Sequence, residues 1–322
     1  ESTSMEEKNV VLSPFLPSQK VEIHEDEPVK ATDLVQRWSR KYDADMPEIR
    51  ALLKKRLESF RFSASSFTDF FDIGYAGPQV FFERHLLPNL RQPATEQQIY
   101  GTVMHKVLDQ VSRCEIDLGS AVKLYDEEIR GVGLEDEVVA NLKKKGERSL
   151  TLLFEQCDKV IKAKDSYSEV NFSAEKMFLD EVPLTGMVDK IILDKEAKVA
   201  EIFDYKTGQH KDKKWGADPT LFKYQQQLMF YKILLNRSVE FSKYEVGGGH
   251  ILFVTPDEYG KIWQKDYEYT ADDEAMTIKL IKKIYKIVSD LSFLDKPEIF
   301  IPPVNGAGMK EIRDFIEKIL DI

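Results

Sequence analysis

The apolar positions of this chain follow a helical period up to about residue 164 and a strand-like period after residue 168. Apolar residues spaced three or four apart form one face of a helix, whereas alternation is typical of a strand. The pattern predicts helices at 32–42, 47–60, 63–71, 79–87, 101–111, 119–145 and 147–164. Ser63 is the expected N-cap of the third of these helices.

The second half of the chain predicts a small sheet between helices. Strands are expected at 169–179, 184–193, 199–205, 250–254 and 261–269, the first three forming a meander. Further helices are expected at 220–236, at 271–290 and from Met309, with an extended piece at 298–303. Gly247–Gly249 predicts a flexible turn before a strand. This order of elements indicates an α/β or α+β protein with one core.

Composition excludes some classes of protein. With 322 residues, 42% of them hydrophobic, the chain can bury a sizeable core, which excludes disordered and fibrous classes. The 46 Lys and Arg against 56 Asp and Glu leave a net charge of -10, which disfavours a broad surface that coats nucleic acid. Half of this charge lies in residues 1–49, where 11 acids face 6 bases, so this stretch is predicted to be a tether.

Cysteine usage and hydropathy bear on the compartment. Cys114 and Cys157 are too few for a disulfide scaffold or for a four-thiolate metal site, and they suit a reducing, cytoplasmic compartment. No apolar run approaches the length of a membrane span, and no signal peptide opens the chain, so we expect no membrane partner.

The candidate chemistry lies in two apolar strands that each carry one acid. Asp189 follows Gly186-Met-Val, and Asp204 lies between Phe203 and Tyr205. An unpaired carboxylate is costly to bury, and two acids on adjacent strands repel each other. A divalent cation between them resolves both problems, because Mg²⁺ prefers carboxylate oxygens. Asp189 and Asp204 are therefore predicted to bind Mg²⁺ or Mn²⁺, with the Tyr205 backbone carbonyl as a further ligand.

Lys206 completes this pattern. Residues 204 and 206 share one face of a strand, so an ammonium group lies beside a metal-binding carboxylate. There it can orient a water molecule or stabilise the charge that develops on a phosphate. The alternative is a pair of strands joined by a salt bridge, without catalytic function.

At this point the sequence resembles a known family. Gly186-Met-Val-Asp-Lys and Phe203-Asp-Tyr-Lys-Thr-Gly resemble two motifs of the RecB-type nucleases in the PD-(D/E)XK superfamily. Gly101-Thr-Val-Met-His resembles the family's upstream helix, and Gln227-Leu-Met-Phe-Tyr its later Gln-x-x-x-Tyr signature. The segment from Phe62 to Phe70 looks like the start of this domain in UvrD-like and AddAB-type helicase–nucleases. The resemblance covers roughly residues 61–270.

The resemblance implies a fold and a division of the chain. The expected fold is a restriction-endonuclease-like α/β core, with a small mixed sheet flanked by helices and a helical N-terminal extension. Residues 1–60 would be the acidic tether and extension, 61–300 the nuclease domain, and 301–322 a helical tail packed on that domain.

The resemblance also implies roles for single residues. His105 would be a metal ligand beside Asp189 and Asp204, and Gln227 and Tyr231 would position DNA or brace the site. Apart from the resemblance, Glu175 lies on the strand before Asp189 and is a candidate either for a second shell around the metal or for an additional acidic ligand. Lys211, Lys213 and Lys214 lie in a basic loop with His210 and Trp215 interleaved, which predicts contacts with the DNA backbone; a solvated loop is the alternative.

The implied function is a Mg²⁺- or Mn²⁺-dependent DNA nuclease, with exonuclease action expected ahead of endonuclease action. Its expected partners are DNA and a helicase motor, in repair, recombination or degradation of DNA. Many relatives hold an iron–sulfur cluster, but here the matching position is Gly77-Pro78 and only two cysteines exist, so none is expected. The chain has no P-loop and is not predicted to hydrolyse ATP itself.

Two rival functions remain open. The first is a catalytically silent nuclease fold that guides DNA or contacts a subunit. Retention of both acids, the lysine, His105 and the Gln/Tyr pair favours activity instead. The second is a metal-dependent phosphoesterase acting on small molecules, which the absence of a Gly-rich phosphate loop disfavours.

Overall fold

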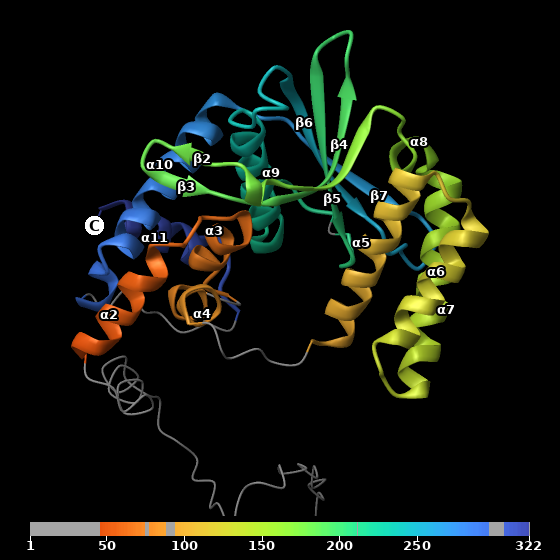
Figure 1. Ribbon diagram of the computed structural model, residues 1–322, viewed down its shortest axis with the longest axis horizontal. Helices are drawn as coiled ribbons and strands as arrows, with labels where there is room; N and C mark the ends of the chain where they lie inside the picture. Colours follow the sequence, from red (N-terminus) through yellow and green to blue (C-terminus); the bar gives the residue numbers. More distant parts are fainter. Residues whose placement is uncertain (1–45, 75–76, 88–93, 211, 296–305, 322) are drawn as a thin grey trace, which may run out of the picture.

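A mixed five-stranded sheet forms the centre of the protein, with helices on both of its faces (Figure 1). The computed structural model describes residues 46–74, 77–87, 94–210, 212–295 and 306–321. The predicted helix at 32–42, the extended piece at 298–303 and Lys211 lie outside these residues.

The sheet has the strand order β1-β4-β5-β6-β7. Its strands are β1 (Ser166–Asn171), β4 (Met187–Asp194), β5 (Val199–Lys206), β6 (Glu245–Phe253) and β7 (Trp263–Tyr267). β5 and β6 are parallel and the other neighbours antiparallel, so the predicted meander holds for the first three strands of the sheet. A separate hairpin is formed by β2 (Met177–Leu179) and β3 (Val182–Leu184).

Two of the predicted strands are divided in the structure. The segment 169–179 leaves the main sheet through a 3₁₀ turn at Phe172–Ala174 before it enters β2. The segment 184–193 is split at Gly186 between β3 and β4. At Gly186 a Cβ atom would lie 2.6 Å from Leu234 Cδ1, so the absence of a side chain allows this crossing.

The prediction of a flexible turn at Gly247–Gly249 is wrong, because these glycines lie inside β6. A Cβ at Gly247 would lie 2.6 Å from Glu201 Oε1, and one at Gly248 would lie 2.7 Å from Glu201 Oε2. The side chain of Glu201 on β5 therefore occupies the space that a side chain on β6 would need.

The helices surround the sheet in two groups. One group is α2 (Met46–Leu57), α3 (Ala64–Phe71), α4 (Pro78–Phe81), α9 (Pro219–Leu235), α10 (Ala271–Ser289) and α11 (Met309–Asp321). The other is α5 (Glu96–Cys114), α6 (Leu118–Gly131), α7 (Asp136–Gln156) and α8 (Asp158–Ile161). α4 continues into a π-helical turn at Phe82–Leu86, and Ser63 caps α3 as predicted, in a reciprocal capping box with Ser66.

The long helix predicted at 119–145 is wrong, because α6 ends at Gly131 and α7 begins at Asp136. Gly133, with a φ of 77°, provides the left-handed backbone that reverses the chain. The two helices then pack as a hairpin in which Gly146 of α7 faces the Tyr125 ring of α6. A Cβ at Gly146 would lie 2.2 Å from that ring.

We expect Gly146→Ala to lower the free energy of unfolding by about 1–3 kcal/mol, since the added methyl group overlaps a buried aromatic ring. The gain in helix propensity, about 1 kcal/mol, offsets this only in part. Gly131→Ala is the matched control, because nothing lies within 4 Å of a Cβ there, and it should not destabilise the protein. Urea unfolding of both variants tests this, and equal stability would contradict the proposed close approach.

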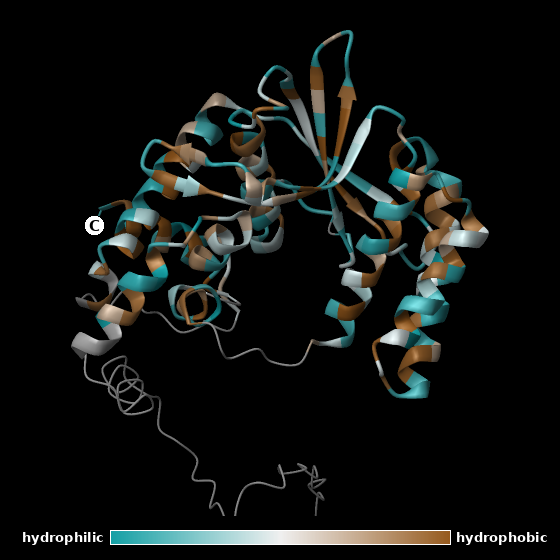
Figure 2. Ribbon diagram, in the orientation of Figure 1, coloured by the Kyte–Doolittle hydropathy of each residue, from teal (hydrophilic) through white to brown (hydrophobic). Residues whose placement is uncertain are grey.

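Each face of the sheet has its own hydrophobic core. One core joins the sheet to α3, α9, α10 and the β2–β3 hairpin, and it also contains Leu53 of α2 and Phe315 of α11. The other joins Tyr205 and Leu252 to α5, α6 and α7. Figure 2 shows hydrophobic stretches along the central strands, with teal and brown alternating along the surrounding helices. Among the described residues, no helix has the length and apolar character needed to cross a bilayer.

Candidate metal and nuclease site

The two predicted acids lie where the pairing of β4 with β5 ends. The ladder ends with Lys190 opposite Phe203, and the next residue on each strand is an acid, Asp189 or Asp204. In place of a backbone bond, Asp189 Oδ2 accepts a hydrogen bond of 2.6 Å from the Tyr205 N–H. The structure therefore brings these two carboxylates together at one end of a strand pair.

Asp204 is 1% exposed, so its carboxylate is almost completely removed from water. Its Oδ2 lies 2.6 Å from Lys206 Nζ as an ion pair, yet among the described residues this oxygen has no hydrogen bond of proper geometry. Burial raises the pKa of Asp204 to about 6; the Lys206 charge opposes this and the Asp189 charge adds to it.

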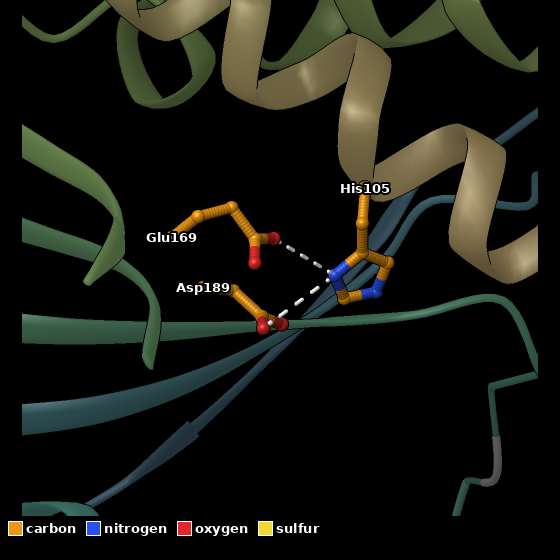
Figure 3. A group of neighbouring side chains, drawn as sticks. All are labelled: His105, Glu169 and Asp189. Atoms are coloured by element: carbon orange, nitrogen blue, oxygen red, sulfur yellow. Dashed lines mark hydrogen bonds and ion pairs between the residues drawn. The ribbon is translucent and has the colours of Figure 1, made fainter. Parts of the chain in front are cut away.

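His105 approaches this end of the strands from α5. Its Nε2 lies 3.2 Å from the Tyr205 carbonyl oxygen, and its Nδ1 lies 3.3 Å from Glu169 Oε1 and 3.5 Å from Asp189 Oδ1 (Figure 3). Burial favours the neutral imidazole, but the Asp189 and Glu169 carboxylates outweigh it and raise the pKa of His105 to about 10. The same imidazolium holds the pKa of Asp189 below its usual value despite burial.

Glu169 is the site residue that sequence reasoning missed. It lies on β1 between Ser168 and Val170, which pair with Lys190 and Val188, so it faces Asp189 on β4. Its backbone has a φ of 48°, a left-handed conformation that a glutamate adopts only at a cost. The sequence carried one usable signal, an acid near the start of the strand preceding Asp189.

Glu175, the acid expected near the metal, does not lie in this group. The 3₁₀ turn at Phe172–Ala174 carries it away from the sheet. Its carboxylate accepts hydrogen bonds from the Ser238 hydroxyl at 3.1 Å and the Val239 N–H at 3.0 Å, beyond the C-terminal end of α9. Its contacts connect the loop after α9 to the segment leading into the β2–β3 hairpin.

α9 supplies the groups that hold Asp204 and Lys206. Gln227 donates from Nε2 to Asp204 Oδ1 at 2.9 Å, and its Oε1 accepts from Lys206 Nζ at 2.9 Å. Tyr231, one turn further along α9, lies with its hydroxyl 3.4 Å from Asp204 Oδ1. In this structure Gln227 and Tyr231 therefore brace the acid and the lysine.

The two described lysines of the basic loop are exposed. Lys213 Nζ lies 3.2 Å from Asp218 Oδ2, the carboxylate that also caps α9, and Lys214 points to solvent. The structure places both in the segment that follows the strand bearing Lys206.

The donor atoms fit a divalent cation. Among the described residues, His105, Glu169 and Asp189 offer ligand atoms that all lie within 4.8 Å of one another. Imidazole nitrogen and carboxylate oxygens suit Mg²⁺ or Mn²⁺. The buried Asp204 oxygen without a hydrogen-bond partner lies on the neighbouring strand. The Asp204 side chain points towards Lys206 and Gln227. The three potential metal ligands that lie together are therefore His105, Asp189 and Glu169, whereas the sequence predicted Asp204 in the place of Glu169.

The mixed sheet with helices on both faces defines the class of this protein as an α/β protein with a restriction-endonuclease-like core, as predicted from the sequence. The sequence pattern of the PD-(D/E)XK nuclease superfamily matches residues 78–298. This match spans more than half of the chain, and the chain therefore belongs to that superfamily, which indicates a nuclease. The comparison with curated proteins found no match.

Metal binding at this site is expected to release protons. At neutral pH His105 is protonated, because its pKa is about 10, and a metal can bind its nitrogen only after that proton leaves. The affinity for Mn²⁺ should therefore rise about tenfold per pH unit up to about pH 10. Below pH 6 the dependence should be steeper, because Asp204 is then protonated as well.

Calorimetric titration with Mn²⁺ in buffers of different ionisation enthalpy measures this proton release. His105→Ala is the control and should bind Mn²⁺ more weakly, with less proton release. An affinity for Mn²⁺ that does not change between pH 7 and 9 would contradict the raised pKa of His105, and an affinity unchanged in His105→Ala would contradict His105 as a ligand.

Proposed function

We propose that this protein is a metal-dependent deoxyribonuclease that hydrolyses phosphodiester bonds. The observation that supports this most directly is the pair of buried acids, Asp189 and Asp204, beside Lys206 at one end of β4 and β5. His105, Glu169, Asp189 and Asp204 would hold Mg²⁺ or Mn²⁺, with the Tyr205 carbonyl as a further ligand. When bound, the cation would lower the pKa of a water molecule and offset the charge of the phosphate.

Lys206 has the position of a group that acts on the reacting phosphate. Asp204 and Gln227 hold its ammonium, so its orientation is set before a substrate arrives. Burial disfavours the charged lysine, but the Asp204 and Asp189 charges raise its pKa, so it remains a cation. A preoriented cation in a buried site stabilises negative charge on a phosphate much more than the same cation in water.

The finer assignment is a RecB-type nuclease that acts with a helicase motor. It is supported by five separate motifs. Four of them contribute residues to one connected group, namely His105, Asp189, Asp204 with Lys206, and Gln227. The net charge of -10 supports delivery of the strand by a partner, because an acidic protein attracts DNA weakly. The proposed division of the chain is an acidic tether and helical extension at 1–60, the nuclease domain at 61–300 and a helical tail at 301–322.

Incubation with end-labelled single- and double-stranded DNA, with and without Mg²⁺ or Mn²⁺, tests the proposal. Cleavage that requires the metal is the expected result, and release of mononucleotides or short products from one end would indicate exonuclease action. If neither DNA is cut with either metal, the nuclease proposal fails and a catalytically silent fold takes its place.

A further inference from the structure

A row of aromatic rings leads from the catalytic lysine to the edge of the sheet. In the ladders, Lys206 of β5 is paired with Phe253 of β6, and Phe253 is paired with Trp263 of β7. Paired residues point to the same face of a sheet, so these three side chains lie side by side on the face covered by α9. Trp263 is two strand spacings from Lys206, about 10 Å.

Side chains from α9 and from the loop after β5 fill the row. Lys206 Nζ lies 4.9 Å from the centre of the Tyr224 ring, which lies 6.4 Å from that of Phe253. His210 lies 5.3 Å from Phe253 and is stacked on Trp263, with ring centres 4.2 Å apart and planes 3° from parallel. Lys261 Nζ lies 3.3 Å from the Trp263 ring centre and ends the row.

The chemistry of this row indicates which molecule it binds. Aromatic rings bracketed by lysines are the combination that binds single-stranded nucleic acid, because bases stack on the rings while ammonium groups contact phosphates. Burial lowers the pKa of the His210 imidazole, and Lys265, half-buried on β7, adds positive charge close enough to lower it further. The acid nearest to Trp263, Asp257, accepts hydrogen bonds from the indole N–H and the Lys261 backbone N–H, so its charge is partly compensated.

The outer face of Trp263 is the position where a base can stack. His210 covers one face of the indole, and the exposed side chain of Lys261 covers the other. An exposed lysine is flexible, so it can leave the ring for a phosphate oxygen while a base takes its place on the indole. Bases inside a duplex are already stacked on one another, so this exchange favours a single strand.

We propose that Tyr224, His210, Trp263 and Lys261, packed around the buried ring of Phe253 (1% exposed), form a binding surface for single-stranded DNA that leads into the site at Lys206. That the bound strand leads towards Lys206 rests on the proposed nuclease function. DNA binding is measured without cleavage, so the binding surface and the nuclease function can fail separately.

The test uses the full chain in EDTA and compares oligothymidylate with an abasic oligodeoxyribonucleotide of the same length. The wild type should bind oligothymidylate more tightly. Trp263→Ala should lower this affinity about tenfold or more and leave the affinity for the abasic strand nearly unchanged. Lys261→Ala should weaken both and reduce the dependence on salt. Tyr259→Ala, an aromatic residue of the same turn that is 87% exposed, is the matched control and should change neither.

A second measurement keeps the test valid if Trp263→Ala unfolds. Oligothymidylate should quench tryptophan fluorescence in the wild type, and Trp263→Phe should remove most of this quenching. The proposal that bases stack on Trp263 would be overturned if Trp263→Ala lost the same affinity for oligothymidylate and for the abasic strand. Full fluorescence quenching in Trp263→Phe would overturn it as well. A protein that passes both tests but cuts no DNA with any metal would overturn the nuclease proposal alone.

Discussion

Replacing Lys206 with methionine is expected to lower the rate of DNA cleavage about a thousandfold, while the protein remains folded. The Lys206 ammonium is oriented by Asp204 and Gln227, and methionine keeps the length of the side chain without its charge. Asp204 then loses its ion pair, but its pKa is already about 6, so it can take up a proton rather than remain a buried, unpaired anion.

Single-turnover cleavage rates and far-UV circular dichroism check this prediction. Lys232→Met is the matched control. Lys232 lies on α9 and also forms an ion pair, but with Glu274 and away from Asp189 and Asp204. It should cleave DNA at the rate of the wild type. A Lys206→Met protein that cuts DNA within tenfold of the wild-type rate would exclude Lys206 from the chemistry.

Replacing Glu169 with asparagine is expected to stabilise the metal-free protein by about 1 kcal/mol and to weaken metal binding at least tenfold. Asparagine adopts the left-handed backbone of this position more readily than glutamate. The change also leaves two carboxylates, Asp189 and Asp204, to balance the charges of His105 and Lys206.

Urea unfolding in EDTA and in excess Mn²⁺ measures both effects. In EDTA the variant should be the more stable protein, and in Mn²⁺ the order should reverse, because only the wild type gains binding energy. Glu115→Asn is the matched control, since Glu115 has a φ of 49° at the C-cap of α5, where its side chain is exposed. It should gain stability in both conditions. If Glu169→Asn responds to Mn²⁺ as the wild type does, Glu169 is not a ligand.

The strained backbone at Glu169 and the raised pKa of Asp204 have a common interpretation. Each is a local cost in the metal-free protein that a bound cation would reduce. At Glu169 the cation would bind the carboxylate that the strained backbone presents, and at Asp204 it would offset burial and the repulsion from Asp189. Because a bound cation would reduce both costs, metal binding is expected to make β1, β4 and β5 more rigid.

Errors in the sequence-based elements occurred where contacts between distant residues decided the conformation. Gly247–Gly249 has the composition of a loop, but side chains from elsewhere in the fold, Glu201 at Gly247 and Gly248 and Tyr269 at Gly249, fill the space beside these glycines inside β6. The helix predicted at 119–145 is an exception, because it breaks at Gly133, whose left-handed backbone with a φ of 77° is a local feature.

The sequence by itself determined an α/β or α+β class from the order of its elements, and its resemblance to a known family implied the restriction-endonuclease-like core. It also determined the strand positions of the acids and the lysine, because these depend on local rules. An acid within an apolar strand is conspicuous, and side chains two residues apart must share a face, which pairs Asp204 with Lys206. His105 was expected beside them only from the resemblance to a known family, and only the tertiary structure decided that Glu169 joins the group and Glu175 does not. His105 and Glu169 reach Asp189 through the crossing of α5 and the register of β1, while Glu175 is carried away by a single turn. Register and crossing depend on the packing of the whole core, and neither leaves a local trace in the chain.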